Sequence, residues 1–172
     1  MPRAVEGRCA VFGRTSPVSL GGGGVVATIR WHPWTARARF EILDAAGSHV
    51  LASGSRVGFW GRSYRVAGAR QEPVLDVKLS GRGPSGRSTV TLPDGRTLTA
   101  KGNWSARKFT LADETGAVVA RLVTTSSAFS LRPDSLAFEL TTPVLSIVQA
   151  VGLAQCMRAV AEARRQSAAA GG

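Results

Sequence analysis

Apolar and polar residues alternate with a period of two in several short stretches of this chain. Ala38, Phe40 and Ile42 would share one face of an extended strand, with the charged residues between them on the other face. This alternation is typical of a half-buried β-strand. The pattern recurs between turn residues and predicts about twelve short strands. We expect them at residues 25–30, 37–43, 49–53, 56–59, 63–66, 73–80, 88–92, 97–102, 108–112, 118–124, 128–131 and 135–140.

Short turn sequences connect several of these predicted strands. They read DAAG at residues 44–47, PDG at 93–95 and DETG at 113–116. Asp, Pro and Gly at such positions favour tight hairpin turns. Parallel strands need crossovers of a dozen or more residues, which these connections are too short to provide. The sequence therefore predicts an antiparallel sheet.

One stretch near the C-terminus has a different pattern. Residues 144–157 (VLSIVQAVGLAQCM) carry no charge, and a helix that is apolar all round must be enclosed. Its length of about 21 Å is short of the roughly 30 Å of a bilayer core. We therefore expect a helix at 143–165 buried in protein, with Thr142 as N-cap and Pro143 in the first turn. The amides of Gln149 and Gln155 would then need buried partners.

The helix and the strands together predict a fold class. A sheet of about twelve strands that closes on itself is too wide for its own side chains to fill. We expect a mainly β protein, a closed antiparallel barrel around the buried C-terminal helix. One domain would span residues 25–166. Residues 1–24 would form a flexible lead-in whose removal leaves stability unchanged, and 167–172 a disordered tail.

Two segments of the predicted domain resemble each other. Phe, Asp and Gly recur at the same spacing with an offset of 69, in Phe40, Asp44 and Gly47 and again in Phe109, Asp113 and Gly116. Two interpretations are open. The barrel could consist of two related halves, or two hairpins could share turn chemistry by chance.

The charge of the chain is strongly basic, with 22 Lys and Arg against 11 Asp and Glu and a net charge of +11. An anionic partner would explain this, as would a compositional bias toward arginine. The basic residues of the first two thirds, with Trp60, Tyr64 and Trp104 among them, could bind phosphates of lipid headgroups or of nucleic acid. The alternative is an ordinary solvated face. The candidate ligand-binding residues are Arg56, Arg62, Arg65, Lys78, Arg82, Arg87, Lys101, Arg107 and Lys108.

Residues suited to catalysis are few. His32 and His49 are interpreted as surface or turn residues, and Cys9 and Cys156 as reduced thiols. The glycine run at 21–24 lacks the Lys-Ser/Thr of a phosphate-binding loop. We therefore expect no enzymatic activity, no metal and no cofactor. No secretory signal follows Met1, so we expect a cytoplasmic protein, at most peripheral to a membrane.

Residues 92–140 and the helix after them resemble the LURP-one-related family. The resemblance is clearest in GAVVAR at 116–121 and FSLRPDS at 129–135, and it extends over residues 40–158. That family shares the tubby C-terminal-like fold, a twelve-stranded barrel around a C-terminal helix, with tubby proteins and phospholipid scramblases. Tubby proteins bind phosphoinositide headgroups, but neither their motif nor a scramblase calcium segment maps onto this chain. The resemblance implies a non-enzymatic module that binds anionic phospholipid headgroups. A nucleic-acid-binding or protein-interaction scaffold is the alternative.

Overall fold

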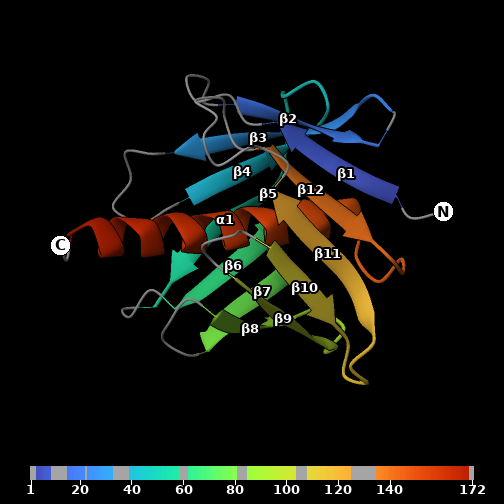
Figure 1. Cartoon of the computed structure of the whole chain (residues 1–172). Coiled ribbons are helices and arrows are strands. Elements are labelled where there is room, and N and C mark those ends of the chain that lie inside the picture. The colour runs from blue at the N-terminus through green and yellow to red at the C-terminus, as the bar shows by residue number, and fades with distance from the viewer. Residues whose placement is uncertain are drawn as a thin grey trace.

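The computed structural model describes residues 3–8, 15–21, 23–32, 39–58, 62–80, 85–103, 108–124 and 135–170. These ranges contain twelve strands and one long helix (Figure 1). The strands are β1 (Arg3–Arg8), β2 (Thr15–Leu20), β3 (Val25–His32), β4 (Arg39–Leu43), β5 (Val50–Val57), β6 (Ser63–Gly68), β7 (Pro73–Ser80), β8 (Ser85–Thr91), β9 (Thr97–Asn103), β10 (Lys108–Ala112), β11 (Val118–Thr124) and β12 (Ser135–Leu140). The helix is α1 (Ile147–Ala170).

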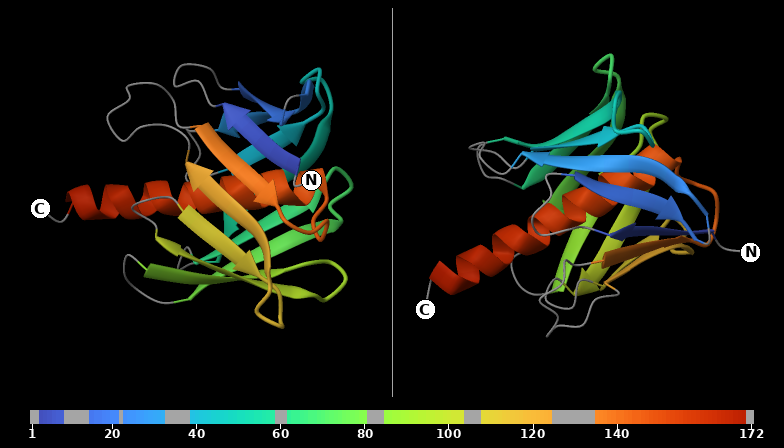
Figure 2. Two further views of the ribbon diagram at one scale, coloured as in Figure 1. Left: turned by 45° about the vertical axis from the view of Figure 1, so that its right-hand side comes forward. Right: turned by 90° about the horizontal axis from the view of Figure 1, so that it is seen from above.

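The sheet has a simple topology. From β2 to β12, every strand pairs antiparallel with the next strand of the chain. Strand β1 lies between β12 and β2, paired along its full length with β12 but with β2 only from Val5 to Gly7. The sheet curls around α1, as Figure 2 shows from two sides. The predicted antiparallel, mainly β fold with one C-terminal helix is confirmed.

The N-terminal segment differs from the prediction. Strands β1 and β2 lie within residues 1–24, which the sequence predicts to be a flexible lead-in. Val18 is only 2% exposed, and Ser16 is 4% exposed. The inward positions of β2 include a serine, and Pro17 interrupts the segment, so the hydrophobic pattern is weak. Pairing with β3 nevertheless gives this backbone the hydrogen-bond partners that a strand needs.

Strand β5 also differs, because one strand replaces the two expected at 49–53 and 56–59. Gly54 is typical of a break between strands, but it lies inside β5 opposite Phe40. A Cβ at this position would collide with the Phe40 ring. Glycine here lets the ring lie against the backbone, which is a packing role. The strand expected at 128–131 lies outside the described residues.

Helix α1 begins and ends later than predicted. The amides of Thr141 and Thr142 bond to the Val119 carbonyl, so Thr142 belongs to the connection from β12 and is not the N-cap. Ser146 caps the helix instead. Its hydroxyl accepts a hydrogen bond from the backbone N–H of Gln149 (3.2 Å). The side-chain oxygen of Gln149 accepts one from the backbone N–H of Ser146 (2.9 Å). The helix continues to Ala170, into the segment expected to be a disordered tail.

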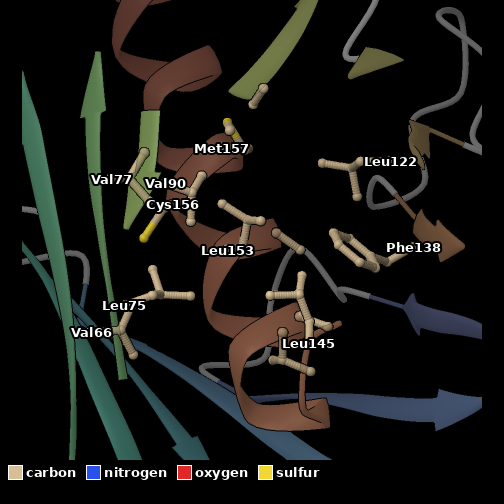
Figure 3. Packing of buried hydrophobic residues seen from close by; sticks show 14 of the residues in the cluster. Val66, Leu75, Val77, Val90, Leu122, Phe138, Leu145, Leu153, Cys156 and Met157 are labelled. Carbon is tan, nitrogen blue, oxygen red and sulfur yellow. The ribbon is translucent and has the colours of Figure 1, made fainter. Parts of the chain in front are cut away.

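The interior of the sheet is filled by α1. All its residues from Ala150 to Met157 are buried. Figure 3 shows Leu153 and Met157 between Val77 and Val90 on one side and Leu122 and Phe138 on the other. The prediction that the uncharged stretch 144–157 is enclosed by protein is confirmed for residues 150–157, whereas Ser146 and Ile147 are exposed.

Gln149 and Gln155 of α1 both form hydrogen bonds with the sheet. Gln155, 4% exposed, accepts a hydrogen bond from the Trp31 indole N–H (3.0 Å). The Gln149 side-chain amide donates to the Val74 carbonyl (3.3 Å). These bonds offset the cost of removing the amides from water.

The strands repeat at nearly constant intervals. Strands β1 and β7 begin at Arg3 and Pro73, and β2 and β8 at Thr15 and Ser85, in both cases 70 residues apart. In the two hairpins that share Phe, Asp and Gly, both turn glycines have positive φ, 72° and 89°. Each donates its N–H to the turn aspartate carbonyl at 3.0 Å. These regularities favour two related six-strand halves.

Candidate functional site

The two ends of the sheet differ in structure. Tight turns at residues 44–49, 69–72, 92–96 and 113–117 lie at one end, where α1 begins. We call this the turn end. Helix α1 runs through the sheet and projects beyond the opposite end, which we call the exit end (Figure 2).

Exposed cations gather on the outer surface of β7 to β10. Lys78 alternates with the buried Leu75 and Val77 and therefore points outward. Arg87, Lys101 and Lys108 are likewise exposed on β8, β9 and β10. Arg87 lies directly opposite Lys101 in the sheet register, so their Cβ atoms are about 5 Å apart. Strands β8, β9 and β10 contain no acidic residue.

A fifth cation belongs to the same surface. Arg121 is exposed on β11 opposite Thr110, which lies opposite Lys101 on its other side. We define the basic face as Lys78, Arg87, Lys101, Lys108 and Arg121. The charge distribution along the sequence did not indicate Arg121, because acids and bases cancel in number after residue 109. Only strand pairing places it beside the others.

Four cations of the basic face have no acid opposite them in the sheet register, and Arg121 lies opposite Glu139. Within the described part of the chain, none of the five forms an ion pair. Like charges directly opposite each other in a sheet are destabilising, so the Arg87–Lys101 pair opposes folding. Thr89 of β8 lies opposite Lys78, and Thr110 of β10 lies opposite Lys101. Their hydroxyls add neutral hydrogen-bond donors to the same surface.

The structure separates other predicted site residues from this face. Arg65 is bound to Asp76 (Nε to Oδ1, 2.8 Å), which raises the pKa of its guanidinium. Arg56 has the strand parity of the buried Ala52 and Gly54 and therefore faces inward. Arg62 is exposed just before β6, where its backbone carbonyl accepts a hydrogen bond from the backbone N–H of Leu79. Arg82, Arg107, Trp60 and Trp104 lie outside the described residues.

Arg56 lies opposite Tyr64 at the inner side of the sheet. Tyr64 is 2% exposed, and burial raises the pKa of its phenol. Cys156 on α1 is fully buried, which raises the pKa of its thiol, so it is a core residue and a poor nucleophile. Arg158 stacks over the Trp31 ring (5.4 Å from Cζ to the ring centroid) and bonds to Glu162 (2.9 Å). The stacking on Trp31 joins α1 to β3, and the bond to Glu162 lies within the helix.

The turn end carries carboxylates. Asp44, Asp94 and Asp113 each accept a hydrogen bond from a backbone N–H further along their turn, at 2.8, 3.1 and 2.9 Å. These bonds, with a side-chain hydroxyl as the largest contribution for Asp113, hold the pKa of each carboxyl below its usual range. Glu72 and Glu114 lie in the same set of turns.

One turn combines Ser, His and Asp. The Ser48 hydroxyl and Asp44 Oδ2 both contact Nδ1 of His49, at 3.1 and 3.0 Å. A nucleophile–base–acid relay needs the serine and the carboxylate on different ring nitrogens. His49 is also 83% exposed. This group of side chains therefore stabilises the turn and lacks the geometry of a hydrolase.

The described residues also bear on membrane insertion. In the ranges given above, no helix is both long enough and apolar enough to span a bilayer.

Comparison with known proteins gives matches among solved structures only. No family model matches the chain, and no curated protein matches it. The crystal structure of a LURP-one-related protein from Arabidopsis thaliana matches with a TM-score of 0.57 and 12% sequence identity, over 88% of this chain and 90% of that one. At this identity the likeness concerns the fold alone. The chain therefore has a fold related to that of the plant protein.

Proposed function

We propose that this chain is a non-enzymatic, LURP-one-related module whose basic face binds anionic phospholipid headgroups at a membrane surface. The observation that carries the proposal is the Arg87–Lys101 pair, two exposed like charges directly opposite each other, with no ion-pair partner among the described residues. A bound phosphate would remove their repulsion. The fold resemblance and the absence of acids on β8 to β10 support the same proposal.

Vesicle binding tests this proposal. Arg87→Gln combined with Lys101→Gln should weaken binding to phosphatidylserine-containing vesicles about 30-fold, since each cation near an anionic surface contributes about 1 kcal/mol. The melting temperature should stay level or rise, because a like-charge pair is removed. Co-sedimentation at low salt would measure binding. Added salt should weaken it, because the Debye length is only about 8 Å at physiological ionic strength.

The control variant is Arg70→Gln with Arg96→Gln, which removes the same charge from the turn end. It should bind nearly as well as the wild type. An equal loss of vesicle affinity in both variants would mean that net charge alone drives binding. Absence of any affinity of the wild type for phosphatidylserine vesicles at low salt would refute the proposal. If single-stranded DNA binds instead, and the Arg87/Lys101 variant weakens it, the nucleic-acid alternative is favoured.

We also propose that β1 closes the sheet into a barrel around α1. The pairing of β1 with both neighbours supports closure, and so does its correspondence to β7, which pairs with β6 of the first half and β8 of the second. Deleting residues 1–8 should then expose the edges of β2 and β12. Hydrogen exchange at residues 18–20 should become much faster in the shortened chain. Unchanged exchange there would indicate that the sheet is open between β1 and β2.

A further inference from the structure

The cations of strands β3 to β10 lie toward one end of the molecule. Lys78 is two residues from the end of β7, Arg87 is two residues from the start of β8, and Lys108 begins β10, all at the exit end. The same holds on β3 to β6 and on β9, whereas Arg121 lies in the middle of β11. On those five strands the residues are Arg30 of β3, Arg39 of β4, Arg56 of β5, Arg65 of β6 and Lys101 of β9.

The acids are distributed in the opposite sense. Asp44, Glu72, Asp94, Asp113 and Glu114 all occupy the turn end. Their hydrogen bonds within the turns keep the aspartates ionised well into the acidic range. Of the remaining described acids, Glu41 and Asp76 lie in mid-strand and are bound to arginines. Glu6 and Glu139 lie on β1 and β12, and Glu162 on α1 is bound to Arg158. The turn end also carries Arg70 and Arg96, but its acids outnumber them. The molecule is therefore electrically polar along the direction of its strands.

The separation of the two ends is large compared with electrostatic screening. Strands β3, β5 and β7 have eight residues each, a length of about 26 Å. A strand tilt of about 40° leaves roughly 20 Å between the ends. The Debye length is about 8 Å at physiological ionic strength, so a surface potential felt at one end falls about tenfold before it reaches the other.

We infer that the protein docks end-on at an anionic lipid surface, with the exit end and the C-terminal part of α1 toward the lipid and the turn end away from it. This orientation brings the cations of β3 to β10 toward the surface and keeps the turn carboxylates outside its field. Side-on docking through the basic face would engage fewer cations. The inference rests on the proposed lipid binding and adds which part of the molecule meets the membrane.

Two matched positions separate end-on from side-on docking. Thr15 and Thr91 are exposed threonines at strand ends. Thr15 lies at the exit end of β2, and Thr91 at the turn end of β8, on the same side as the basic face. Strands β2 and β8 lie on opposite sides of α1 (Figure 1). Only end-on docking brings Thr15 close to lipid and keeps Thr91 away.

The experiment uses single-cysteine variants of the full chain. Thr15→Cys, Thr91→Cys and Ala46→Cys, each with Cys9→Ser, carry a fluorophore on the introduced cysteine. Cys156 stays unlabelled because it is fully buried. The variants bind to phosphatidylserine vesicles that contain a lipid-borne quencher. We expect most of the Thr15 signal to be quenched, and little of the signal from Thr91 and Ala46.

Other outcomes would overturn the inference. Quenching at Thr91 without Thr15 would mean side-on docking, and quenching at Ala46 and Thr91 would mean docking through the turn end. Equal quenching at all three positions would mean no preferred orientation. Co-sedimentation of the same samples separates these cases from absence of binding, which would refute the proposed function as well. Adding Ala45→Lys and Ala69→Lys at the turn end should reduce the difference in quenching between the Thr15 and Ala46 positions.

Discussion

Replacing Gly152 with arginine should abolish soluble, cooperatively folded protein. Gly152 lies in the buried part of α1, and a Cβ there would already be 3.2 Å and 3.3 Å from the two γ-methyl groups of Val66. An arginine side chain would have to displace β6 and bury an unpaired charge. A buried unpaired charge costs several kcal/mol, which is comparable with the roughly 5–15 kcal/mol that stabilises a typical domain.

Two substitutions control this result. Gly24→Arg introduces the same side chain at an exposed glycine where a Cβ would have no neighbouring atom within 4 Å, so it should melt like the wild type. Gly152→Ala should lower the melting temperature only moderately, because Val66 must shift by a few tenths of an ångström. Thermal unfolding followed by circular dichroism would measure all three. A soluble Gly152→Arg protein with a wild-type melt would mean that this face of α1 is not enclosed.

The enclosure of α1 could be predicted from sequence because it depends on composition alone. A long uncharged stretch has to be buried wherever it lies. The helix start could also have been found, since Ser146 and Gln149 have the spacing of a capping box. Pro143 favours an earlier start, although the backbone just before it is bound to β11. The partner of Gln155 could not be predicted, because Trp31 is distant in sequence.

The basic face was only partly predictable for a related reason. Alternation within a strand gives the outward direction of Lys78, and the same rule separates the inward Arg56 from the outward Arg65. Which cations become neighbours depends on register. Register is set by turn lengths and by bulges such as the one between Leu111 and Ala112. The Arg87–Lys101 pair and the inclusion of Arg121 therefore emerge only from the folded sheet.

Removing residues 1–23 should destroy cooperative unfolding, contrary to what the glycine-rich segment suggests from sequence. The deletion takes away β1 and β2, so that β3 and β12 each lose one of their two neighbours. It would open one side of the interior to water and leave two unpaired strand edges, which favour aggregation. Thermal melts and size-exclusion chromatography of the shortened chain would show the loss.

Substitutions within β2 distinguish a structural strand from a loose lead-in without shortening the chain. Val18 is 2% exposed, whereas Pro17 beside it is exposed. Val18→Ala removes two buried methyl groups and should cost about 2 kcal/mol, or about 4–8 °C in melting temperature for a chain of this size. Pro17→Ala should change the melting temperature little. If both variants and the deletion melt like the wild type, β1 and β2 contribute nothing to the fold, and the sheet must be stable with β3 and β12 as open edges.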